Sequence, residues 1–457
     1  MTDLIISISG VRGIVGDSLT PEVVLRFAAA FGAWARRGRD GRAAVVLGRD
    51  ARTSGPLLTH AAAAGLTGVG VDVLEVGLVP TPTVQLEVER QRAQGGIVIT
   101  ASHNPIEWNA LKFVGPDGMF LDGADGRAVR RGAETAELPW ADWSAIGGTR
   151  AIPDAVAHHL DRTLALLPDT AAIAARGFHV ALDCVRGAGG VIMPALLERL
   201  GCRVTAINTE TDGRFPRAPE PIPEHLDELS RLVRDTGADL GMAVDPDVDR
   251  LALVDETGRP IGEDYTLAFA VRAVFGRAVP PPGAREVVCN LSTSLVVDDA
   301  ARAHDAVVVR TPVGEAHVAR TAVSRRAVMA GEGNGGVIFP AVHAGRDAPV
   351  AAALALELLA RERRTVSQIV ALGPRYVILK AKVPRAEADL DSIYRALGDR
   401  FPDATRDTAD GLRLAWPDRW VHVRPSGTEP VVRLMAEAPE ARDAEALLDA
   451  CRAEVAR

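Results

Sequence analysis

Short apolar runs alternate with longer Ala- and Leu-rich stretches through most of the chain. The runs AAVVLGRD, VDVLEVG and GGIVIT predict strands, and helices are expected near 21–36 and 56–68. The alternation recurs from about residue 151, with strands at FHVALD, CRVTAIN and DLGMAVD, and again through EVVCNLS, DAVVVRT and RAVMAGEG. Strands that alternate with helices are typical of βαβ units and mainly parallel sheets. The pattern therefore predicts three related α/β domains.

The pattern changes near residue 376. The runs YVILKAKV, LRLAW, WVHVRP and VVRLMAEA predict a small sheet, with a helix near 387–397 and a closing helix at 441–456. This is an α+β arrangement. Because 457 residues are too many for one ordinary core, we expect four domains, at 1–148, 149–258, 259–372 and 373–457.

Composition excludes several classes of protein. The net charge of −8 offers no general attraction to nucleic acid or to an anionic membrane, so an anionic ligand must be drawn by local Arg and Lys. The four cysteines have no paired spacing, which predicts neither a disulfide framework nor a zinc site and fits the cytoplasm. The start of the chain does not read as a signal peptide. The apolar stretch 350–360 contains Glu357 and predicts a helix with a buried face rather than a membrane span.

The segment AVDPDVDRLALVD carries Asp245, Asp247 and Asp249 at alternate positions after an apolar run. Alternate residues of an extended chain point the same way, so three carboxylates would converge and repel unless a cation neutralised them. An all-oxygen site favours Mg²⁺. An EF-hand is disfavoured because Arg250 stands where that loop needs glycine. A phosphatase with Asp245 as nucleophile remains the alternative.

The segment GGIVITASHNPIEWNALKF places Ser102 at the end of a predicted strand, where α/β sheets usually bind ligands. His103 is adjacent, and Lys112 follows as an acid/base or a point charge on phosphate. A lone serine in an Asn-Pro turn is more often a helix cap. Ser102 is therefore a candidate nucleophile only in combination with the other segments.

The segment VHVRPSGTEPVVRL combines a guanidinium, two hydroxyls and free backbone N–H groups in a tight loop, which suits a phosphate dianion as well as a plain turn between strands. The residues are Arg424, Ser426, Gly427, Thr428 and, in the next strand, Arg433. Weaker candidates stand in other glycine-containing or strand-end segments: Arg12, Arg49, Arg52, Gly314, Glu315, Glu332 and Asn334.

Taken together, these segments resemble the α-D-phosphohexomutase family. TASHNP matches its phosphoserine loop, DPDVDR its metal loop, GEGNGGVIFP its sugar-binding loop and RPSGTEP its phosphate-binding loop, in the family's order and over the whole chain. The resemblance implies an α/β fold of four domains around a central cleft, three of them related and the fourth α+β. It also implies transfer of a phosphoryl group from phospho-Ser102 to a sugar monophosphate, reorientation of the bisphosphate, and return of its other phosphate.

The resemblance assigns a role to each candidate. Ser102, Lys112, Arg12 and His103 become catalytic, and Ser102 joins the three aspartates around Mg²⁺. Arg250, Gly314, Glu332 and Asn334 are expected to bind the sugar, and Arg424, Ser426, Gly427, Thr428 and Arg433 its phosphate. The implied activator is a hexose 1,6-bisphosphate, and the only partner expected is a small sugar phosphate, bound by a monomer or homodimer.

One departure concerns the sugar-binding loop. Many members of the family end this loop in Ser-Gly-His, whereas Asn334, Gly335 and Gly336 stand here, with His103, His317 or His343 as possible replacements. The forms TPVG and GEGNGG are closer to the branch with phosphoglucosamine mutases and archaeal-type mannose and glucose mutases. We therefore expect glucosamine phosphate as substrate, with mannose or glucose phosphate as the alternative. A non-catalytic sugar-phosphate sensor is disfavoured, since it needs neither a nucleophile nor three carboxylates.

Overall fold

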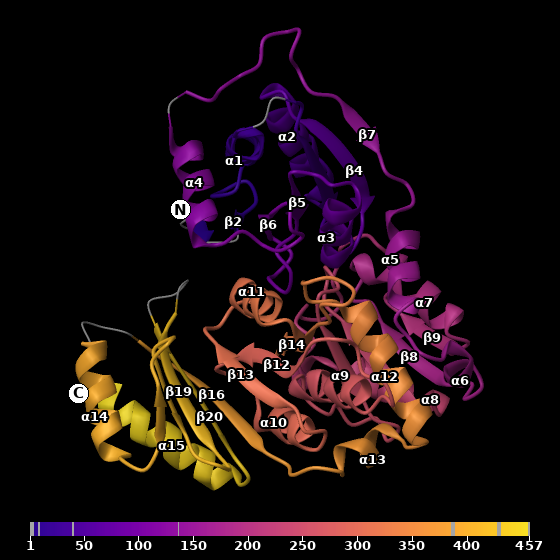
Figure 1. Ribbon diagram of the computed structural model, residues 1–457, viewed down its shortest axis with the longest axis vertical. Helices are drawn as coiled ribbons and strands as arrows, with labels where there is room; N and C mark the ends of the chain where they lie inside the picture. Colours follow the sequence, from indigo (N-terminus) through magenta and orange to yellow (C-terminus); the bar gives the residue numbers. More distant parts are fainter. Residues whose placement is uncertain are drawn as a thin grey trace.

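The computed structural model describes residues 4–7, 10–38, 41–135, 137–384, 389–426 and 431–455. In these ranges the strands form four sheets that follow one another along the chain (Figure 1). The first sheet and its helices lie at the top of the view, the second and third are side by side below it, and the fourth lies at the lower left.

The first sheet has the strand order β1-β2-β6-β5-β3-β4-β7. Its strands β5, β3, β4 and β7 run parallel, whereas β1, β2 and β6 pair in antiparallel fashion, so the sheet is mixed. The strands are β1 (Ile5–Ser7), β2 (Gly10–Ile14), β3 (Ala44–Arg49), β4 (Asp72–Leu78), β5 (Gly95–Ile99), β6 (Trp108–Val114) and β7 (Thr149–Ala151). Helices α1 (Pro21–Arg36) and α2 (Gly55–Gly68) were predicted, whereas α3 (Thr81–Arg90) and α4 (Gly123–Glu134) were not.

The second and third sheets share one topology. Each has three parallel strands and one antiparallel edge strand, in the orders β11-β10-β8-β9 and β15-β14-β12-β13. The strands are β8 (His179–Asp183), β9 (Arg203–Ile207), β10 (Leu240–Val244), β11 (Leu251–Val254), β12 (Ala284–Asn290), β13 (Val307–Thr311), β14 (Ala327–Glu332) and β15 (Gly336–Ile338). The strands β6-β5-β3-β4 of the first sheet repeat this order and these directions. The prediction of three related α/β units is therefore confirmed at the level of topology.

Helices surround these two sheets. They are α5 (Ala155–Leu164), α6 (Thr170–Ala174), η1 (Ala188–Val191), α7 (Met193–Arg199), η2 (Pro223–His225), α8 (Asp227–Thr236), α9 (Asp264–Phe275), α10 (Leu295–Arg302), α11 (Glu315–Arg325), α12 (Ala348–Glu362) and α13 (Val366–Val370).

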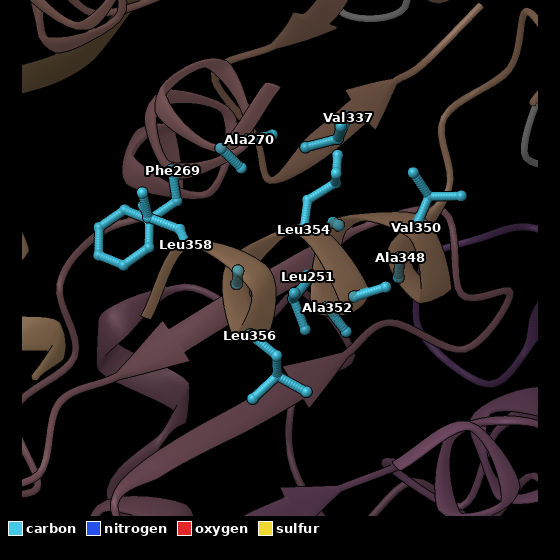
Figure 2. Packing of buried hydrophobic residues seen from close by; sticks show 14 of the residues in the cluster. Leu251, Phe269, Ala270, Val337, Ala348, Val350, Ala352, Leu354, Leu356 and Leu358 are labelled. Atoms are coloured by element: carbon cyan, nitrogen blue, oxygen red, sulfur yellow. The ribbon is translucent and has the colours of Figure 1, made fainter. Parts of the chain in front are cut away.

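Helix α12 lies between the second and third units. It contacts α5, α6 and β11 on the one hand and α9 and β15 on the other, and every residue from 348 to 360 is buried. In Figure 2, Leu354 points toward Val337, Leu358 lies beside Phe269 and Leu356 points the opposite way. The sequence predicted one buried face, but the helix is buried on all sides because it packs against two units at once. No helix in the described ranges is both long and apolar enough to cross a membrane.

The fourth sheet is antiparallel throughout, with the order β16-β20-β19-β18-β17. Its strands are β16 (Val377–Pro384), β17 (Thr405–Asp407), β18 (Leu412–Ala415), β19 (Trp420–Pro425) and β20 (Val431–Ala438), with helices α14 (Leu390–Arg400) and α15 (Ala441–Val455). The α+β character expected from the sequence is confirmed. The predicted domain limits stay predictions, and β7, which follows the limit at 148, pairs with β4 of the first sheet.

Candidate functional site

The predicted chemical groups occupy the same turn in the three related units. This turn joins a parallel strand to the antiparallel strand beside it: β5 to β6, β10 to β11 and β14 to β15. Ser102 lies in the first turn, the three aspartates in the second, and Asn334 in the third, two residues after Glu332, the last residue of β14. Hydrogen bonds and ion pairs join the three turns into one cluster.

Ser102 is buried and has a left-handed backbone, with φ of 48°. A non-glycine residue in this region is strained and needs support from its surroundings. Arg52 provides it: its two Nη atoms donate to the carbonyls of Ser102 (2.7 Å), Asn104 and Pro105 (both 2.6 Å) and Trp108 (2.9 Å). Its Nε pairs with Asp50 at 3.2 Å. Arg52, one of the weaker candidates in the sequence, therefore supports the serine loop.

The hydroxyl of Ser102 faces the acidic loop, the turn between β10 and β11 that carries Asp245, Asp247 and Asp249. Its Oγ donates to Asp245 Oδ2 at 2.9 Å, although the two residues stand 143 positions apart. Nδ1 of His103 lies 3.4 Å from the same Oγ. Lys112, on β6, reaches Asp247 Oδ2 with its Nζ at 2.7 Å and Asp249 Oδ2 at 3.7 Å. Four predicted groups thus meet at one point: the serine, the histidine, the lysine and the acidic loop.

The acidic loop is held by the beginnings of two helices. Thr81, the first residue of α3, donates its backbone N–H to the carbonyl of Asp247 (2.9 Å) and its hydroxyl to Asp247 Oδ2 (2.6 Å). Ala348, the first residue of α12, donates its N–H to the carbonyl of Val248 at 3.2 Å. The positive ends of both helix dipoles favour negative charge at this place.

The three carboxylates fit a divalent cation. Oxygens of Asp245, Asp247 and Asp249 lie within 4.8 Å of one another, and all three residues are fully buried. Asp247 and Asp249 each use Oδ2 for a protein partner, while their Oδ1 atoms are buried without a hydrogen bond. Two unsatisfied anionic oxygens in a buried cluster call for a cation, and hard oxygen donors suit Mg²⁺ or Ca²⁺.

The charges of the cluster are strongly coupled. Burial, together with the neighbouring Asp249 and Asp247, raises the pKa of Asp245 well above its usual range. Burial opposes ionisation of Asp247 too, but the ion pair with Lys112 lowers the pKa of this carboxyl. Burial would lower the pKa of Lys112, yet Asp247 and Asp249 outweigh it and raise this pKa. In the arrangement seen here Lys112 is therefore a cation, which favours the point-charge role over the acid/base role.

His103 has the opposite character. The positive charge of Arg250, followed by burial, lowers the pKa of His103 to about 2. The ring is thus neutral at physiological pH and carries no charge that could attract phosphate. Arg12, on β2, donates to Asn104 Oδ1 at 3.2 Å, and Arg250 donates to Glu220 Oε1 at 2.9 Å.

The sugar-loop candidates are connected to the acidic loop through Arg346, which the sequence analysis missed. Its guanidinium pairs with Asp249 Oδ2 (2.6 Å), Glu315 Oε2 (3.0 Å) and Glu332 Oε2 (3.0 Å). The other oxygen of Glu332 accepts from Asn290 Nδ2 (2.8 Å) and from the backbone N–H of Gly314 (3.1 Å). Asn334 uses its Oδ1 to accept from the backbone N–H of Gly336 at 3.2 Å. Gly314 and Glu315, predicted from one segment, and Glu332, predicted from another, thus form one network.

The histidines proposed as replacements for the missing one differ in position. His103 lies at the serine, as described above. His343 is buried and bonds to Asp347 Oδ2 at 2.9 Å; this carboxylate also pairs with His159 at 2.8 Å. His343 therefore belongs to a buried cluster beside the start of α12. The ring of His317 lies next to Gly314, at 3.7 Å from the place that a Cβ there would occupy.

The phosphate-loop candidates lie in the fourth unit. Arg424 on β19 stands directly opposite Arg433 on β20, so two guanidinium groups begin from paired positions of the sheet. Burial lowers the pKa of Arg424, and the nearby Arg433 lowers it further. The negative charges of Asp410 and Glu332 offset part of this effect. The backbone N–H of Ser426 donates to the carbonyl of Val431 at 2.9 Å. Gly427 and Thr428 lie outside the described residues.

The residues that sequence reasoning missed are Arg346 and Thr81, together with the supporting role of Arg52. Arg346 follows no strand-end pattern and lies in an irregular segment before α12, while α3, which carries Thr81, was not predicted at all. One local signal existed for Arg346: it precedes Asp347, which caps α12 by accepting from Val350 N at 2.9 Å.

Models of known protein families match consecutive parts of the chain. Four models described as phosphoglucomutase/phosphomannomutase alpha/beta/alpha domains I, II and III and C-terminal domain match residues 4–139, 157–258, 262–376 and 378–454.

Individual proteins agree with the family models. The chain is 37% identical to a probable phosphoglucosamine mutase of Methanopyrus kandleri, over 96% of this chain and 95% of that protein. It is also 37% identical to a phosphoglucomutase/phosphomannomutase of Thermococcus kodakarensis, over 96% of both chains. The crystal structure of a phosphoglucomutase/phosphomannomutase family protein from Burkholderia thailandensis superposes with a TM-score of 0.86 and 28% identity, covering 99% of this chain and 96% of that one.

Proposed function

Because the chain belongs to the phosphoglucomutase/phosphomannomutase family, we propose that it interconverts hexose 6-phosphates and hexose 1-phosphates through phospho-Ser102, with glucosamine phosphate as the preferred substrate. The observation that carries the proposal is the position of Ser102. Its hydroxyl lies 2.9 Å from a carboxylate of the buried triad, on a strained loop, with Lys112 paired to the same triad.

Each half-reaction balances without an outside reactant. In the first, the bond between phosphorus and Oγ of Ser102 breaks, a bond forms to the free sugar hydroxyl, and the hydroxyl proton ends on Oγ. The hydroxyl of Ser102 that forms in this way is the group that donates to Asp245 in this structure. In the second half, the bisphosphate has turned and returns its other phosphoryl group to Oγ, and the proton goes back to the sugar. A hexose 1,6-bisphosphate would serve as activator because it can transfer a phosphoryl group to an unphosphorylated Ser102.

Positive charge at the serine stabilises the transferring group. Mg²⁺, held by Asp245, Asp247 and Asp249 with an oxygen on Ser102, would add a divalent charge next to the phosphoryl oxygens. Lys112 and Arg12 supply further charge from β6 and β2. His103, kept neutral by Arg250 and burial, offers a hydrogen-bond acceptor beside the serine hydroxyl.

The sugar and its second phosphate are bound by the remaining turns. Glu332, Asn334, the backbone of Gly314 and the guanidinium of Arg250 offer hydrogen bonds to ring hydroxyls. Arg424, Ser426, Gly427, Thr428 and Arg433 would hold the phosphate that is not reacting. One distal clamp serves both halves of the reaction, because the intermediate carries a phosphate at each end.

The substrate preference rests on the relatives. One is named a phosphoglucosamine mutase and another a phosphoglucomutase/phosphomannomutase, at equal identity. Glucosamine phosphate is our first choice, and mannose or glucose phosphate is the alternative. We further propose a cytoplasmic monomer or homodimer, since its four cysteines all carry free thiols.

The test is ³¹P NMR of the protein with Mg²⁺ and a trace of hexose 1,6-bisphosphate, offered glucosamine, glucose or mannose 6-phosphate in separate tubes. We expect a 1-phosphate signal in each productive tube, fastest with glucosamine, and none with Ser102→Ala. The exposed Ser144→Ala is the matched control and should keep full activity. Release of free phosphate that depends on Asp245 and survives Ser102→Ala would instead identify an aspartyl-phosphate hydrolase.

A further inference from the structure

Arg346 is a buried cation that joins three separate segments. Each of its three guanidinium nitrogens pairs with a different carboxylate: Nη2 with Asp249, Nη1 with Glu332 and Nε with Glu315. Its backbone N–H also donates to Glu315 Oε1 at 3.2 Å. Only 8% of Arg346 is exposed, so water does not screen these pairs.

The side chain of Arg346 depends on a glycine. A Cβ at Gly336 would lie 2.2 Å from Cδ of Arg346 and 2.9 Å from its Cγ, far inside van der Waals contact. Arg346 cannot yield easily, because its backbone forms a bridge with Ile338 and its guanidinium is held by three carboxylates. Residues 336 and 346 therefore share one space, which allows either an arginine from 346 or a side chain at 336.

The ion pair with Arg346 determines which oxygen of Asp249 is left for the metal site. Arg346 takes Oδ2 of Asp249, so the buried Oδ1 is left without a hydrogen bond beside the other acidic groups. The same guanidinium takes Oε2 of Glu332, whose Oε1 is bound by Asn290 and Gly314. One rigid, planar group thus sets the orientation of a carboxylate in each of two turns.

We propose that Arg346 is a positioning residue that couples the metal site to the sugar site, and that residue 336 is a glycine because any side chain there would displace Arg346. The inference rests on the proposed function for what the two sites bind. Loss of Arg346 would remove the one cation that three buried carboxylates share, and both sites would change together.

A lysine cannot replace the arginine. It would keep the charge, but its single ammonium group cannot meet three carboxylates in one plane. Partners that orient metal ligands typically contribute about 10- to 100-fold to metal affinity or activity. We therefore expect Arg346→Lys and Arg346→Ala to weaken Mg²⁺ binding by about that factor, and to raise KM for the sugar phosphate in addition.

The experiment is a double-mutant cycle between Gly336→Ala and Arg346→Ala. Mg²⁺ affinity is measured by isothermal titration calorimetry on the full-length, dephosphorylated protein, and kcat and KM in parallel. Gly336→Ala should weaken Mg²⁺ binding in the wild-type background and have little further effect in the Arg346→Ala background. Arg277→Ala is the matched control: it removes another arginine whose side chain is largely buried, paired with Glu357 at 2.6 Å, and should lower the melting temperature without changing Mg²⁺ affinity.

Two outcomes would overturn the coupling. One is a folded Arg346→Lys or Arg346→Ala variant with the Mg²⁺ affinity and KM of the wild type, and the other is additive effects of the two substitutions. Failure of the proposed function is distinguishable, because it would appear as a wild-type protein that binds Mg²⁺ in an Arg346-dependent way but isomerises none of the hexose phosphates.

Discussion

The aspartates of the acidic loop divide their oxygen atoms between two tasks. Oδ2 of Asp247 binds Thr81 and Lys112, and Oδ2 of Asp249 binds Arg346, whereas both Oδ1 atoms are buried and accept no hydrogen bond. Asp245 differs: its Oδ1 accepts the backbone N–H groups of Asp249 and Arg250, and its Oδ2 accepts the hydroxyl of Ser102. Surrounding cations and donors thus fix one oxygen of each carboxylate, and ligand atoms of the three aspartates lie within 4.8 Å of one another.

Lys112 provides a prediction at this scale. Replacement by methionine keeps much of the side chain's length but removes the charge next to the transferring phosphoryl group. We expect kcat to fall by about 100- to 1,000-fold, the usual effect of losing one preorganised electrostatic contact, with the fold intact by circular dichroism. Lys380→Met, at an exposed position, should behave as the wild type. An unchanged kcat would exclude Lys112 from the reaction.

The residues of the site that could be predicted from the sequence are those in compact local patterns. Ser102 follows an apolar run, and the aspartates alternate after another, so strand geometry alone places them at the end of a sheet. Arg346 and Thr81 have no such pattern. Their roles arise from α12 and α3 packing against the acidic loop, and no local spacing reports contacts between residues that lie 97 or 166 positions apart.

At the scale of elements, three turns of one topology bring the chemistry together. Each turn leaves a parallel strand and returns on an antiparallel one, and each lies at the carboxyl end of a buried strand. The sequence predicted the repeated strands and helices, because their periodicity is local. It did not predict α3, whose polar segment TPTVQLEVER is nonetheless buried against the first sheet and α5, nor the full burial of α12.

The serine loop depends on Arg52. This fully buried arginine satisfies four backbone carbonyls and pairs with Asp50, so Arg52→Ala leaves a buried carboxylate without its cation. We expect a loss of about 3–5 kcal/mol in the free energy of unfolding, measured by urea denaturation. Arg42→Ala, which breaks a solvent-exposed pair with Asp72, should change the midpoint little. Equal effects of the two substitutions would contradict the support role.

Because the second and third units share helix α12, we expect them to unfold together. Leu356 is fully buried in the helix that both units share (Figure 2). Leu356→Ala should cost about 2–5 kcal/mol and should shift the unfolding of both units together in differential scanning calorimetry. Leu372→Ala, at a position that is 44% exposed, is the control. Two separate transitions, only one of which moves, would show that the units do not share a cooperative core.

At the scale of the whole molecule, the fourth unit is joined to the third by buried polar contacts. Glu437 accepts from the hydroxyl of Ser294 and from Leu295 N at 2.9 Å, and within its own sheet it accepts from Trp420 Nε1 at 2.5 Å. His422 and Ser292 add a bond of 2.8 Å. These contacts hold the sheet that carries Arg424 and Arg433 against the unit that carries Glu332. Sequence patterns gave the fold of each unit, but contacts between units depend on surfaces that no periodicity describes.

The distal clamp can be tested separately from the metal site. Arg424→Ala removes a charged hydrogen-bond donor for the non-reacting phosphate, so kcat/KM should fall by about 10- to 100-fold, equivalent to a charged hydrogen bond of roughly 1.5–3 kcal/mol. Mg²⁺ affinity should be unchanged, because Arg424 lies in another unit. The exposed Arg442→Ala serves as control. A loss of Mg²⁺ binding with Arg424→Ala would contradict this division of labour.

The most direct test of the account follows the phosphoryl group itself. The protein, first phosphorylated with hexose 1,6-bisphosphate and freed of excess ligand, is mixed with one equivalent of glucosamine 6-phosphate. Intact-protein mass spectrometry and ³¹P NMR then report both partners. We predict that the phosphoryl group passes from Ser102 into a glucosamine bisphosphate, and that glucosamine 1-phosphate then accumulates while Ser102 becomes phosphorylated again. Release as free phosphate, or a phosphoryl group located on Asp245 in place of Ser102, would contradict the mutase mechanism.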